Sequence, residues 1–397
     1  MTKALSTRAV RAGIDCDTAF GAVTPPIVLS ANFSFDGIDG KRRYDYSRSG
    51  NPTRDQLADA LASLEGGAGA VVTATGMAAV SLILHALLGP GDRLLVPHDC
   101  YGGSWRLFSA LAAKDAFELD CCNFTDRSEF EAAIARKPRL IWLETPSNPL
   151  LRITDLAATS AAAHETGALV VVDNTFLSPA LQRPIEHGAD VVIHSTTKYI
   201  NGHSDIVGGA AIARDPAVAE QLAWWANALG ITGAPFDSFL TLRGLRTLEA
   251  RLRIQQENCA AIADLLVQDP HVAAVHYPGL AGHPGHAIAA RQQDGFGAMV
   301  SFEFRGGEDN ARTFLSGLTC ITLAESLGGV ESLIAHPATM SHAALSEEER
   351  ARAGIGSGLL RLSVGIEHVD DLISEIRAGL LRVSACATRR RRCREGT

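Results

Sequence analysis

The chain has 397 residues, a formal net charge of −8, 46% hydrophobic residues and 20% charged residues. This length exceeds one comfortable hydrophobic core and predicts two domains, and the composition excludes a wholly disordered chain. No apolar run approaches the roughly 20 residues that cross a bilayer, and the net acidity argues against a nucleic-acid partner. The first 15 residues lack a secretory pattern and the eight cysteines form no C-x-x-C pair, so we expect a protein of the reducing cytoplasm.

The N-terminal stretch, to about Pro52, is irregular and polar and includes the basic run 41–48. Such a segment buries little of its own surface, so we interpret it as an arm that lies on another surface. From Thr53 onward, leucines spaced four and three residues apart predict a helix that ends at Gly66.

Short apolar strands then alternate with amphipathic helices. Strands are predicted at residues 70–73, 94–97, 140–144, 169–173 and 191–195, and helices at 78–88, 127–135 and 155–165. This alternation is typical of an α/β fold with a largely parallel sheet that is covered on both faces and connected by right-handed crossovers.

The pattern changes near residue 250. A helical stretch is predicted at 236–268, strands at 298–304 and 359–363, and a helix at 309–318. We therefore expect an N-terminal arm (1–55), a large domain (56–249), a small α+β domain (250–384) and an Arg-rich tail (385–397). The tail is a charge run, which favours a disordered, solvated end.

Polar residues and glycines follow the predicted strands, where the carboxyl edge of a parallel sheet binds ligands. Thr75, Gly76 and Met77 follow the first strand and can present backbone N–H groups to an anion at a helix N-terminus. Ser195 and Thr197 follow the fifth strand and add hydroxyl donors. Taken alone, each of these segments is also explained as an ordinary helix cap.

Asp173 ends an apolar strand, where a partly desolvated carboxylate needs a positive partner. A protonated pyridine nitrogen would supply that partner, and a cap for the following turn is the alternative. Lys198 follows another apolar strand, whereas the other four lysines lie in polar contexts. A desolvated lysine becomes a nucleophilic amine. With Tyr101 as a stacking aromatic residue, the set predicts a pyridoxal phosphate site and no metal site.

Five segments resemble the Cys/Met metabolism family of pyridoxal-phosphate enzymes. They are Tyr44–Thr53, Pro97–Gly103, Val172–Phe176, His194–Asp205 and Leu323–Ser332. The resemblance extends from about Thr7 to Leu380, so the Arg-rich tail falls outside it.

The resemblance implies the aspartate-aminotransferase-like fold (fold type I) and a homotetramer built as a dimer of dimers. It implies that Lys198 bonds the cofactor covalently, that Asp173 holds the pyridine nitrogen and that Tyr101 stacks on the ring. The residues implied to hold the phosphate are Gly76, Met77, Ser195 and Thr197, together with Tyr46 and Arg48 from the arm of the neighbouring subunit. Asn148 matches the asparagine that approaches the phenolic oxygen of the cofactor.

The same resemblance implies the substrate contacts. Arg361 matches the arginine that binds the α-carboxylate, for which a guanidinium fork is suited. Arg106 aligns with an arginine near the distal carboxylate of a succinyl leaving group, and an ordinary surface arginine is its alternative. Glu325 and Ser326 lie in a substrate-facing segment, and Asp45 is implied to be a second substrate-facing acid that reaches across the dimer.

The expected reaction is a γ-replacement that joins O-succinylhomoserine and L-cysteine to give cystathionine and succinate, a transsulfuration step of methionine biosynthesis. The partners are then small amino-acid substrates, with no nucleic acid and no membrane. The alternatives are the cleavage of cystathionine or methionine by a γ-lyase, and the use of sulfide by an O-acylhomoserine sulfhydrylase. A non-catalytic cofactor-binding protein is the alternative of another class, and Lys198, Asp173 and Tyr101 together argue against it.

Overall fold

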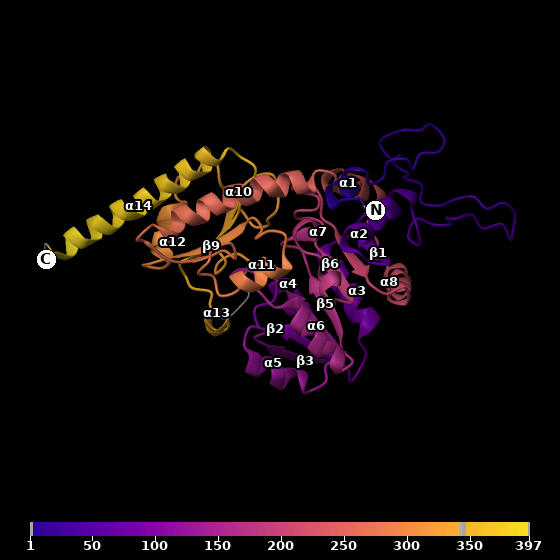
Figure 1. The fold of residues 1–397 in the computed structure, drawn as a ribbon, viewed down its shortest axis with the longest axis horizontal. Helices are drawn as coiled ribbons and strands as arrows, with labels where there is room; N and C mark the ends of the chain where they lie inside the picture. Colours follow the sequence, from indigo (N-terminus) through magenta and orange to yellow (C-terminus); the bar gives the residue numbers. More distant parts are fainter. Residues whose placement is uncertain (1–2, 342, 344–346, 396–397) are drawn as a thin grey trace. The chain divides into compact units, whose positions relative to one another are not determined.

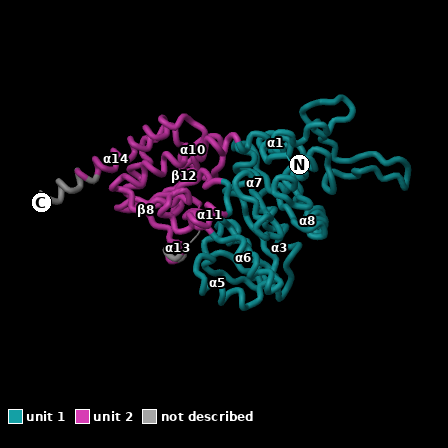
Figure 2. The backbone as a smooth tube through the Cα atoms, in the orientation of Figure 1, with its two compact units in different colours: residues 1–145, 154–249, 292–294 teal, residues 146–153, 250–291, 295–397 magenta. Residues whose placement is uncertain are grey.

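The computed structural model describes residues 3–341, 343 and 347–395. The chain divides into two compact units (Figure 2). Unit 1 comprises Met1–Thr145, Thr154–Glu249 and Gln292–Asp294, and unit 2 comprises Pro146–Ile153, Ala250–Arg291 and Gly295–Thr397. Among the described residues, no helix combines the length and the apolar character that a membrane crossing requires.

Unit 1 is built on a seven-stranded sheet with the order β1-β7-β6-β5-β4-β2-β3 (Figure 1). The strands are β1 (Gly69–Thr73), β2 (Arg93–Pro97), β3 (Glu118–Cys122), β4 (Leu140–Glu144), β5 (Leu169–Asp173), β6 (Val191–His194) and β7 (Gly209–Ala213). Strands β2 to β6 pair in parallel, whereas β7 runs antiparallel to β1 and β6. The five predicted strands are confirmed, and β3 and β7 were missed.

Helices precede, connect and follow these strands. They are α1 (Leu5–Val10), α2 (Pro52–Glu65), α3 (Gly76–Leu87), α4 (Gly102–Ala112), α5 (Arg127–Ile134), α6 (Leu156–Glu165), α7 (Ser178–Leu181), α8 (Pro216–Leu229) and α9 (Pro235–Leu245), with a 3₁₀ helix at Pro184–His187. The predicted start of α2 is confirmed to within one residue. The Asn51 side chain accepts the N–H groups of Thr53 and Arg54, and Gly66 ends the helix in the left-handed conformation, with φ of 79°.

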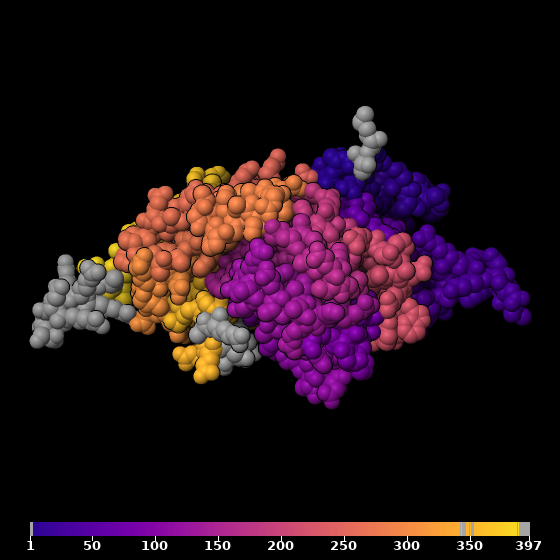
Figure 3. Space-filling model, turned by 60° about the horizontal axis from the view of Figure 1, so that its bottom comes forward, coloured from indigo at the N-terminus to yellow at the C-terminus, as the bar shows by residue number. Residues whose placement is uncertain are grey.

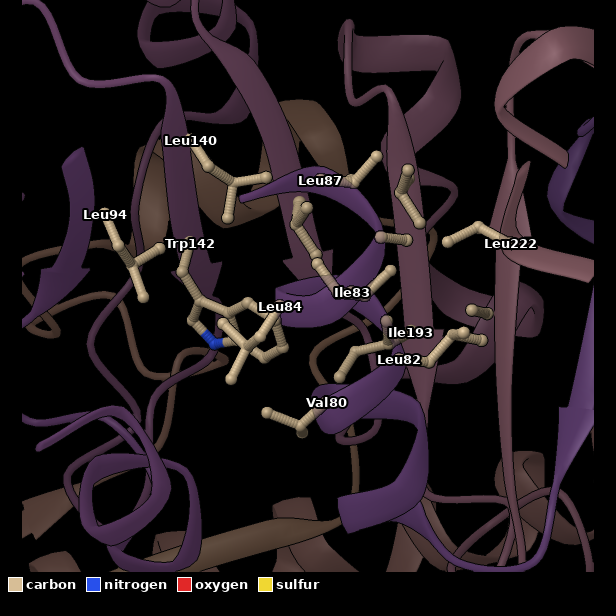
Figure 4. Close-up of a cluster of buried hydrophobic side chains, with 14 of the residues drawn as sticks. Val80, Leu82, Ile83, Leu84, Leu87, Leu94, Leu140, Trp142, Ile193 and Leu222 are labelled. Atoms are coloured by element: carbon tan, nitrogen blue, oxygen red, sulfur yellow. The ribbon is translucent and has the colours of Figure 1, made fainter. Parts of the chain in front are cut away.

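A hydrophobic cluster fixes α3 against the sheet (Figure 4). Leu82 and Ile83 of α3 are fully buried and pack in the same cluster as Trp142 of β4 and Ile193 of β6. Each fully buried side chain of this kind stabilises the fold by about 1.5–3 kcal/mol relative to exposure. This packing sets the position of the N-terminus of α3 at the carboxyl edge of the sheet.

Two glycines, Gly208 just before β7 and Gly209 at its first position, pass close to neighbouring atoms. A Cβ atom added to Gly209 would lie 2.3 Å from the carbonyl oxygen of Thr75, and one added to Gly208 would lie 2.5 Å from Oγ1 of Thr196. Because real Cβ atoms do not approach so closely, only glycine fits at Gly209 without displacing the turn before α3.

Unit 2 contains a five-stranded sheet with the order β10-β11-β12-β9-β8. Its strands are β8 (Val272–His276), β9 (Met299–Phe304), β10 (Thr322–Leu323), β11 (Leu333–Ala335) and β12 (Leu359–Ser363), and its helices are α10 (Leu248–Val267), α11 (His286–Gln292), α12 (Glu308–Leu315), α13 (Glu347–Ala353) and α14 (Val369–Glu395). The single helical stretch predicted at 236–268 is two helices, α9 and α10. The tight turn between them is closed by the N–H of Thr247, which donates to the carbonyl of Gly244.

The Arg-rich segment differs from the disordered end that its charge run favoured. It continues α14 as far as Glu395, and residues 396–397 lie outside the described residues. The segment contains neither glycine nor proline before Glu395, and arginine has a high helix propensity, so nothing local interrupts the helix.

Candidate active site

The N-terminus of α3 and the residue that follows β6 lie against each other in unit 1. Oγ1 of Thr75 accepts the N–H of Ala78 at 2.8 Å. The N–H groups of Gly76 and Met77 have no acceptor inside the helix, because they belong to its first turn. A Cβ atom added to Gly76 would lie 2.9 Å from Cβ of Ser195. Two backbone donors and a hydroxyl group therefore converge at the positive end of a helix, where an anion is favoured.

Thr175 links the ends of β5 and β6. Its N–H donates to Oδ1 of Asp173 at 3.0 Å, and its Oγ1 accepts the N–H of Ser195 at 2.9 Å. Loss of solvation at the end of β5 raises the pKa of Asp173, although the hydrogen bonds from Thr175 and the charge of His194 lower it. A cation placed beside Asp173 would hold the carboxylate in its charged form.

Lys198 lies in a turn whose backbone is fixed by hydrogen bonds. Its N–H donates to the carbonyl of Ser195 at 3.2 Å, and its carbonyl accepts the N–H of Gly202 at 2.8 Å. Nearby, Oγ1 of Thr197 accepts the N–H of Gly208 at 2.9 Å. Lys198 is half-buried, in contrast to the four exposed lysines Lys3, Lys41, Lys114 and Lys137. Among the described residues, Lys198 is therefore the one lysine that is not exposed, and it lies three positions after Ser195.

The backbone of Tyr101 is held by Glu144, a residue that was not predicted from the sequence. Its backbone N–H donates to Oε2 of Glu144 at 2.8 Å, and Nε1 of Trp142 donates to Oε1 of Glu144 at 3.3 Å. Glu144 pairs with Asp173 across the β4–β5 ladder. Burial, and then the charge of Asp173, raise the pKa of Glu144 well above its ordinary value. Its position at the end of an apolar strand, like that of Asp173, is the signal that could have identified it.

The ring of Tyr101 lies beside the anion-binding turn. A Cβ atom added to Gly103 would lie 2.5 Å from Cε1 of Tyr101 and 3.2 Å from Sδ of Met77. Tyr101 is 42% exposed, so part of the residue remains accessible to a ligand. Tyr101, Met77 and Gly76, which were predicted from different segments, are thus close neighbours.

The predicted arm residues are clustered with one another. The guanidinium of Arg48 lies over the ring of Tyr46, 5.8 Å from its centroid, and Nη1 of Arg48 donates to the carbonyl of Asn227 in α8 at 3.2 Å. Asp45 accepts hydrogen bonds from Lys41 and Ser49, which hold its pKa well below its usual range. The arm, drawn in indigo, projects from the rest of unit 1 in Figure 3.

Unit 2 brings together three of the predicted residues. Arg361 in β12 is only 4% exposed, and its Nη1 donates to Oδ1 of Asn148 at 2.8 Å while its Nη2 donates to the carbonyl of Ser326 at 3.0 Å. Ser326 has φ of 86°, a left-handed backbone conformation that is unfavourable for serine. The side chain of Glu325 is exposed, as is that of Arg106 in α4 of unit 1.

The donor set of unit 1 suits pyridoxal phosphate. The amides of Gly76 and Met77 and the hydroxyl of Ser195 match a phosphate dianion. The carboxylate of Asp173 matches a protonated ring nitrogen, and the half-buried amine of Lys198 matches the aldehyde.

Three comparisons describe what the chain resembles. A family model described as Cys/Met metabolism PLP-dependent enzyme matches residues 6–381. The cystathionine gamma-synthase of Escherichia coli (strain K12) is 55% identical over 96% of this chain and 98% of that protein. A cystathionine beta-lyase of Coxiella burnetii (strain RSA 493 / Nine Mile phase I) is 45% identical over 95% of this chain and 97% of that protein.

Among solved structures, the cystathionine gamma synthase from Xanthomonas oryzae pv. oryzae in complex with cystathionine superposes with a TM-score of 0.96. It is 66% identical in sequence, and the match covers 97% of this chain and 100% of that chain. The predicted α/β fold, aspartate-aminotransferase-like with a mostly parallel sheet, is confirmed.

Proposed function

Because the chain belongs to the Cys/Met metabolism family of PLP-dependent enzymes, we propose that it acts as a cystathionine γ-synthase, joining O-succinylhomoserine to L-cysteine and releasing succinate. The observation that carries this proposal is the likeness to a solved cystathionine gamma synthase that holds cystathionine. The cofactor is pyridoxal 5′-phosphate.

We assign the cofactor contacts to the residues that gather at the carboxyl edge of the large sheet. Gly76, Met77, Ser195 and Thr197 bind the phosphate, and Tyr101 stacks on the ring. Asp173 keeps the ring nitrogen protonated, because a half-buried carboxylate is stabilised by a cation. Asn148 donates to the phenolic oxygen, and Tyr46 and Arg48 of a neighbouring subunit complete the phosphate contacts.

The cofactor supplies an electron sink for the bond that breaks at Cα. Lys198 would hold the cofactor through its amine, and the same amine would move protons at Cα and Cβ of the substrate. The backbone hydrogen bonds of Lys198 to Ser195 and Gly202 restrict the positions that its amine can reach. Arg361 binds the α-carboxylate, and Glu325, Ser326 and Asp45 face the rest of the substrate.

A lyase is the second candidate, because a relative at 45% identity is named cystathionine beta-lyase. The exposed carboxylate of Glu325 favours a reaction at Cγ of the substrate, because family members that react at Cβ tend to carry an aromatic residue at this position. Use of sulfide in place of cysteine is the third candidate.

One assay distinguishes these functions. Purified holoenzyme is incubated with O-succinylhomoserine or O-acetylhomoserine against cysteine or sulfide, and separately with cystathionine alone. A synthase forms cystathionine from the succinyl donor and cysteine faster than it degrades cystathionine. Faster breakdown of cystathionine contradicts the proposal, and faster consumption of sulfide than of cysteine favours the sulfhydrylase.

The leaving group is tested at Arg106. A succinyl group has a distal carboxylate and an acetyl group has none, so Arg106→Leu is expected to lower kcat/KM for O-succinylhomoserine about 10- to 100-fold and to leave that for O-acetylhomoserine nearly unchanged. The basis is the loss of a charge-assisted hydrogen bond, worth about 1.5–3 kcal/mol. The measured quantity is the ratio of the two values, which cancels general damage to the protein. An unchanged ratio would remove Arg106 from the recognition of the donor.

We further propose that the protein is a homotetramer in which arms cross between subunits. Apolar side chains are exposed along the arm, with Phe20 at 93% and Ile38 at 99% exposure. Side chains of this kind are usually covered when a segment packs on a partner. A second copy of the chain is the partner that the family resemblance implies.

Mixed subunits test this arrangement. Arg48→Ala subunits and Lys198→Ala subunits are each expected to be nearly inactive, and exchange between them is expected to restore up to roughly a quarter of the wild-type activity. Random exchange makes half of the dimers hybrids, and each hybrid has one intact site. Subunit exchange is verified by a mass tag on one variant. If exchange occurs and activity does not return, then Arg48 acts within its own chain, where it already contacts α8.

A further inference from the structure

Unit 1 contains a buried carboxylate that the proposed reaction does not use. Glu65, the last residue of α2, and His194, the last residue of β6, are both fully buried. Oε1 of Glu65 lies 2.6 Å from Nε2 of His194, a distance that places a proton between the two atoms. Oε2 of Glu65 and Nδ1 of His194 have no hydrogen-bond partner among the described residues.

The same carboxylate oxygen also holds the end of β5. Nδ2 of Asn174 donates to Oε1 of Glu65 at 3.0 Å and to the carbonyl of Gln182 at 2.7 Å. Asn174 directly follows Asp173, and His194 directly precedes Ser195. Oε1 of Glu65 therefore links the ends of β5 and β6. These two strand ends bear Asp173, the proposed partner of the ring nitrogen, and Ser195, a proposed phosphate ligand.

The pair also has an electrostatic effect on the site. The fully buried carboxylate of Glu65 needs hydrogen-bond partners, which His194 and Asn174 supply. The interaction with His194 lowers the pKa of Asp173, opposing the effect of burial. This effect favours the ionised form of Asp173, which is the form that a pyridinium needs.

A second carboxylate–histidine pair lies at the opposite ends of the same strands. Asp190, just before β6, accepts Nε2 of His164 and the N–H of Val170 of β5, each at 2.9 Å. Asp190 is remote from the carboxyl edge because it precedes the strand that Ser195 follows. It ties β5 to β6 as Glu65 does, and it therefore provides a matched control for effects on stability alone.

We propose that Glu65 and His194 are positioning residues for the cofactor: through Asn174 and His194, Glu65 fixes the end of β5 that bears Asp173 and the Ser195–Lys198 turn. This inference rests on the proposed cofactor site and is independent of which substrates react.

The test compares Glu65→Gln with Asp190→Asn. Holoenzyme is prepared from both variants, and three quantities are measured: the visible circular dichroism of the bound cofactor, the Kd of pyridoxal phosphate on reloading, and the melting temperature. Glu65→Gln is expected to raise the Kd about 10-fold or more, equivalent to ~1.4 kcal/mol, and to change the visible circular dichroism. Asp190→Asn is expected to lower the melting temperature while leaving the Kd and the spectrum near those of wild type.

A structural role alone would give equal changes in Kd for the two variants, or no change for Glu65→Gln, and either result overturns the proposal. If Glu65→Gln does not fold, His194→Gln keeps an amide near Oε1 of Glu65 and removes the imidazole, and the same shifts in Kd and spectrum are expected from it. Unchanged values in His194→Gln would equally overturn the proposal.

A double mutant locates the pathway of the effect. If Glu65 acts through Asp173, then Glu65→Gln in an Asp173→Asn background should add less than the Kd increase it causes alone. Full additivity would contradict action through Asp173. Because cofactor binding is measured without substrate, failure of this inference is distinguishable from failure of the proposed reaction.

Discussion

Replacing Lys198 with alanine is expected to abolish covalent attachment of the cofactor and to reduce kcat by about 10²–10⁴-fold from loss of the proton-moving group alone. Lys198 is the half-buried lysine of the chain, and its turn is fixed by hydrogen bonds to Ser195 and Gly202. The measurement is borohydride reduction of the holoenzyme followed by peptide mapping, which identifies the lysine that carries the cofactor.

Lys114→Ala and Lys137→Ala are the matched controls, because both side chains are exposed. Both controls should retain the reduced cofactor on the peptide that contains residue 198. Cofactor mapped to any of the four other lysines would refute the assignment, and so would undiminished turnover by Lys198→Ala.

The second large effect is expected at Arg361. Its hydrogen bonds to Asn148 and to the carbonyl of Ser326 fix the plane of the guanidinium. Arg361→Ala is expected to lower kcat/KM roughly 100- to 5,000-fold, because losing one partner of a buried charge pair costs about 3–5 kcal/mol. Arg361→Lys keeps the charge without the planar fork and should fall between wild type and Arg361→Ala.

Steady-state kinetics with the acyl-homoserine donor check this prediction, and the visible absorbance of the cofactor should be retained in both variants. Arg382 is the control, because it also lies in unit 2 and donates to a backbone carbonyl, that of Phe314, at 3.0 Å. Arg382→Ala should leave kcat/KM near wild type. An equal loss in Arg382→Ala and Arg361→Ala would indicate damage to unit 2 rather than loss of carboxylate binding.

The parallel core of the large sheet was predictable because its strands are continuous apolar runs. β4 is fully buried and β5 is largely buried. Because both faces of such strands are covered, their sequences are nearly continuous apolar runs without polar alternation. β3 was missed because it is a sheet-edge strand with acidic and exposed residues, and β7 because glycine and alanine carry little strand propensity. Both strands are specified by their neighbours rather than by their own sequence.

The candidate site was predictable only in part, for a similar reason. Asp173 and Lys198 each follow an apolar strand, so their unusual position is visible in the sequence. Glu65 is a helix-ending residue 129 positions from His194, and no local pattern connects the two. The hydrogen bond between Arg361 and Asn148 spans 213 positions, so the family resemblance implied both residues without revealing their contact.

Gly209 at the start of β7 and Gly76 at the start of α3 have a consequence for the strength of the proposed phosphate binding. Close packing of Gly209 against Thr75, and of Gly76 against Ser195, leaves the backbone of the phosphate site no room to relax. When a ligand has to order a loop, the binding free energy is weakened by the entropy lost in that ordering. The loss is about 0.5–1.5 kcal/mol for each immobilised side chain. Because the proposed donors are already held in place by their neighbours, we expect their full interaction with a phosphate to contribute to the affinity for the cofactor. The close contacts at Gly209 and Gly76 thus preorganise the proposed phosphate site.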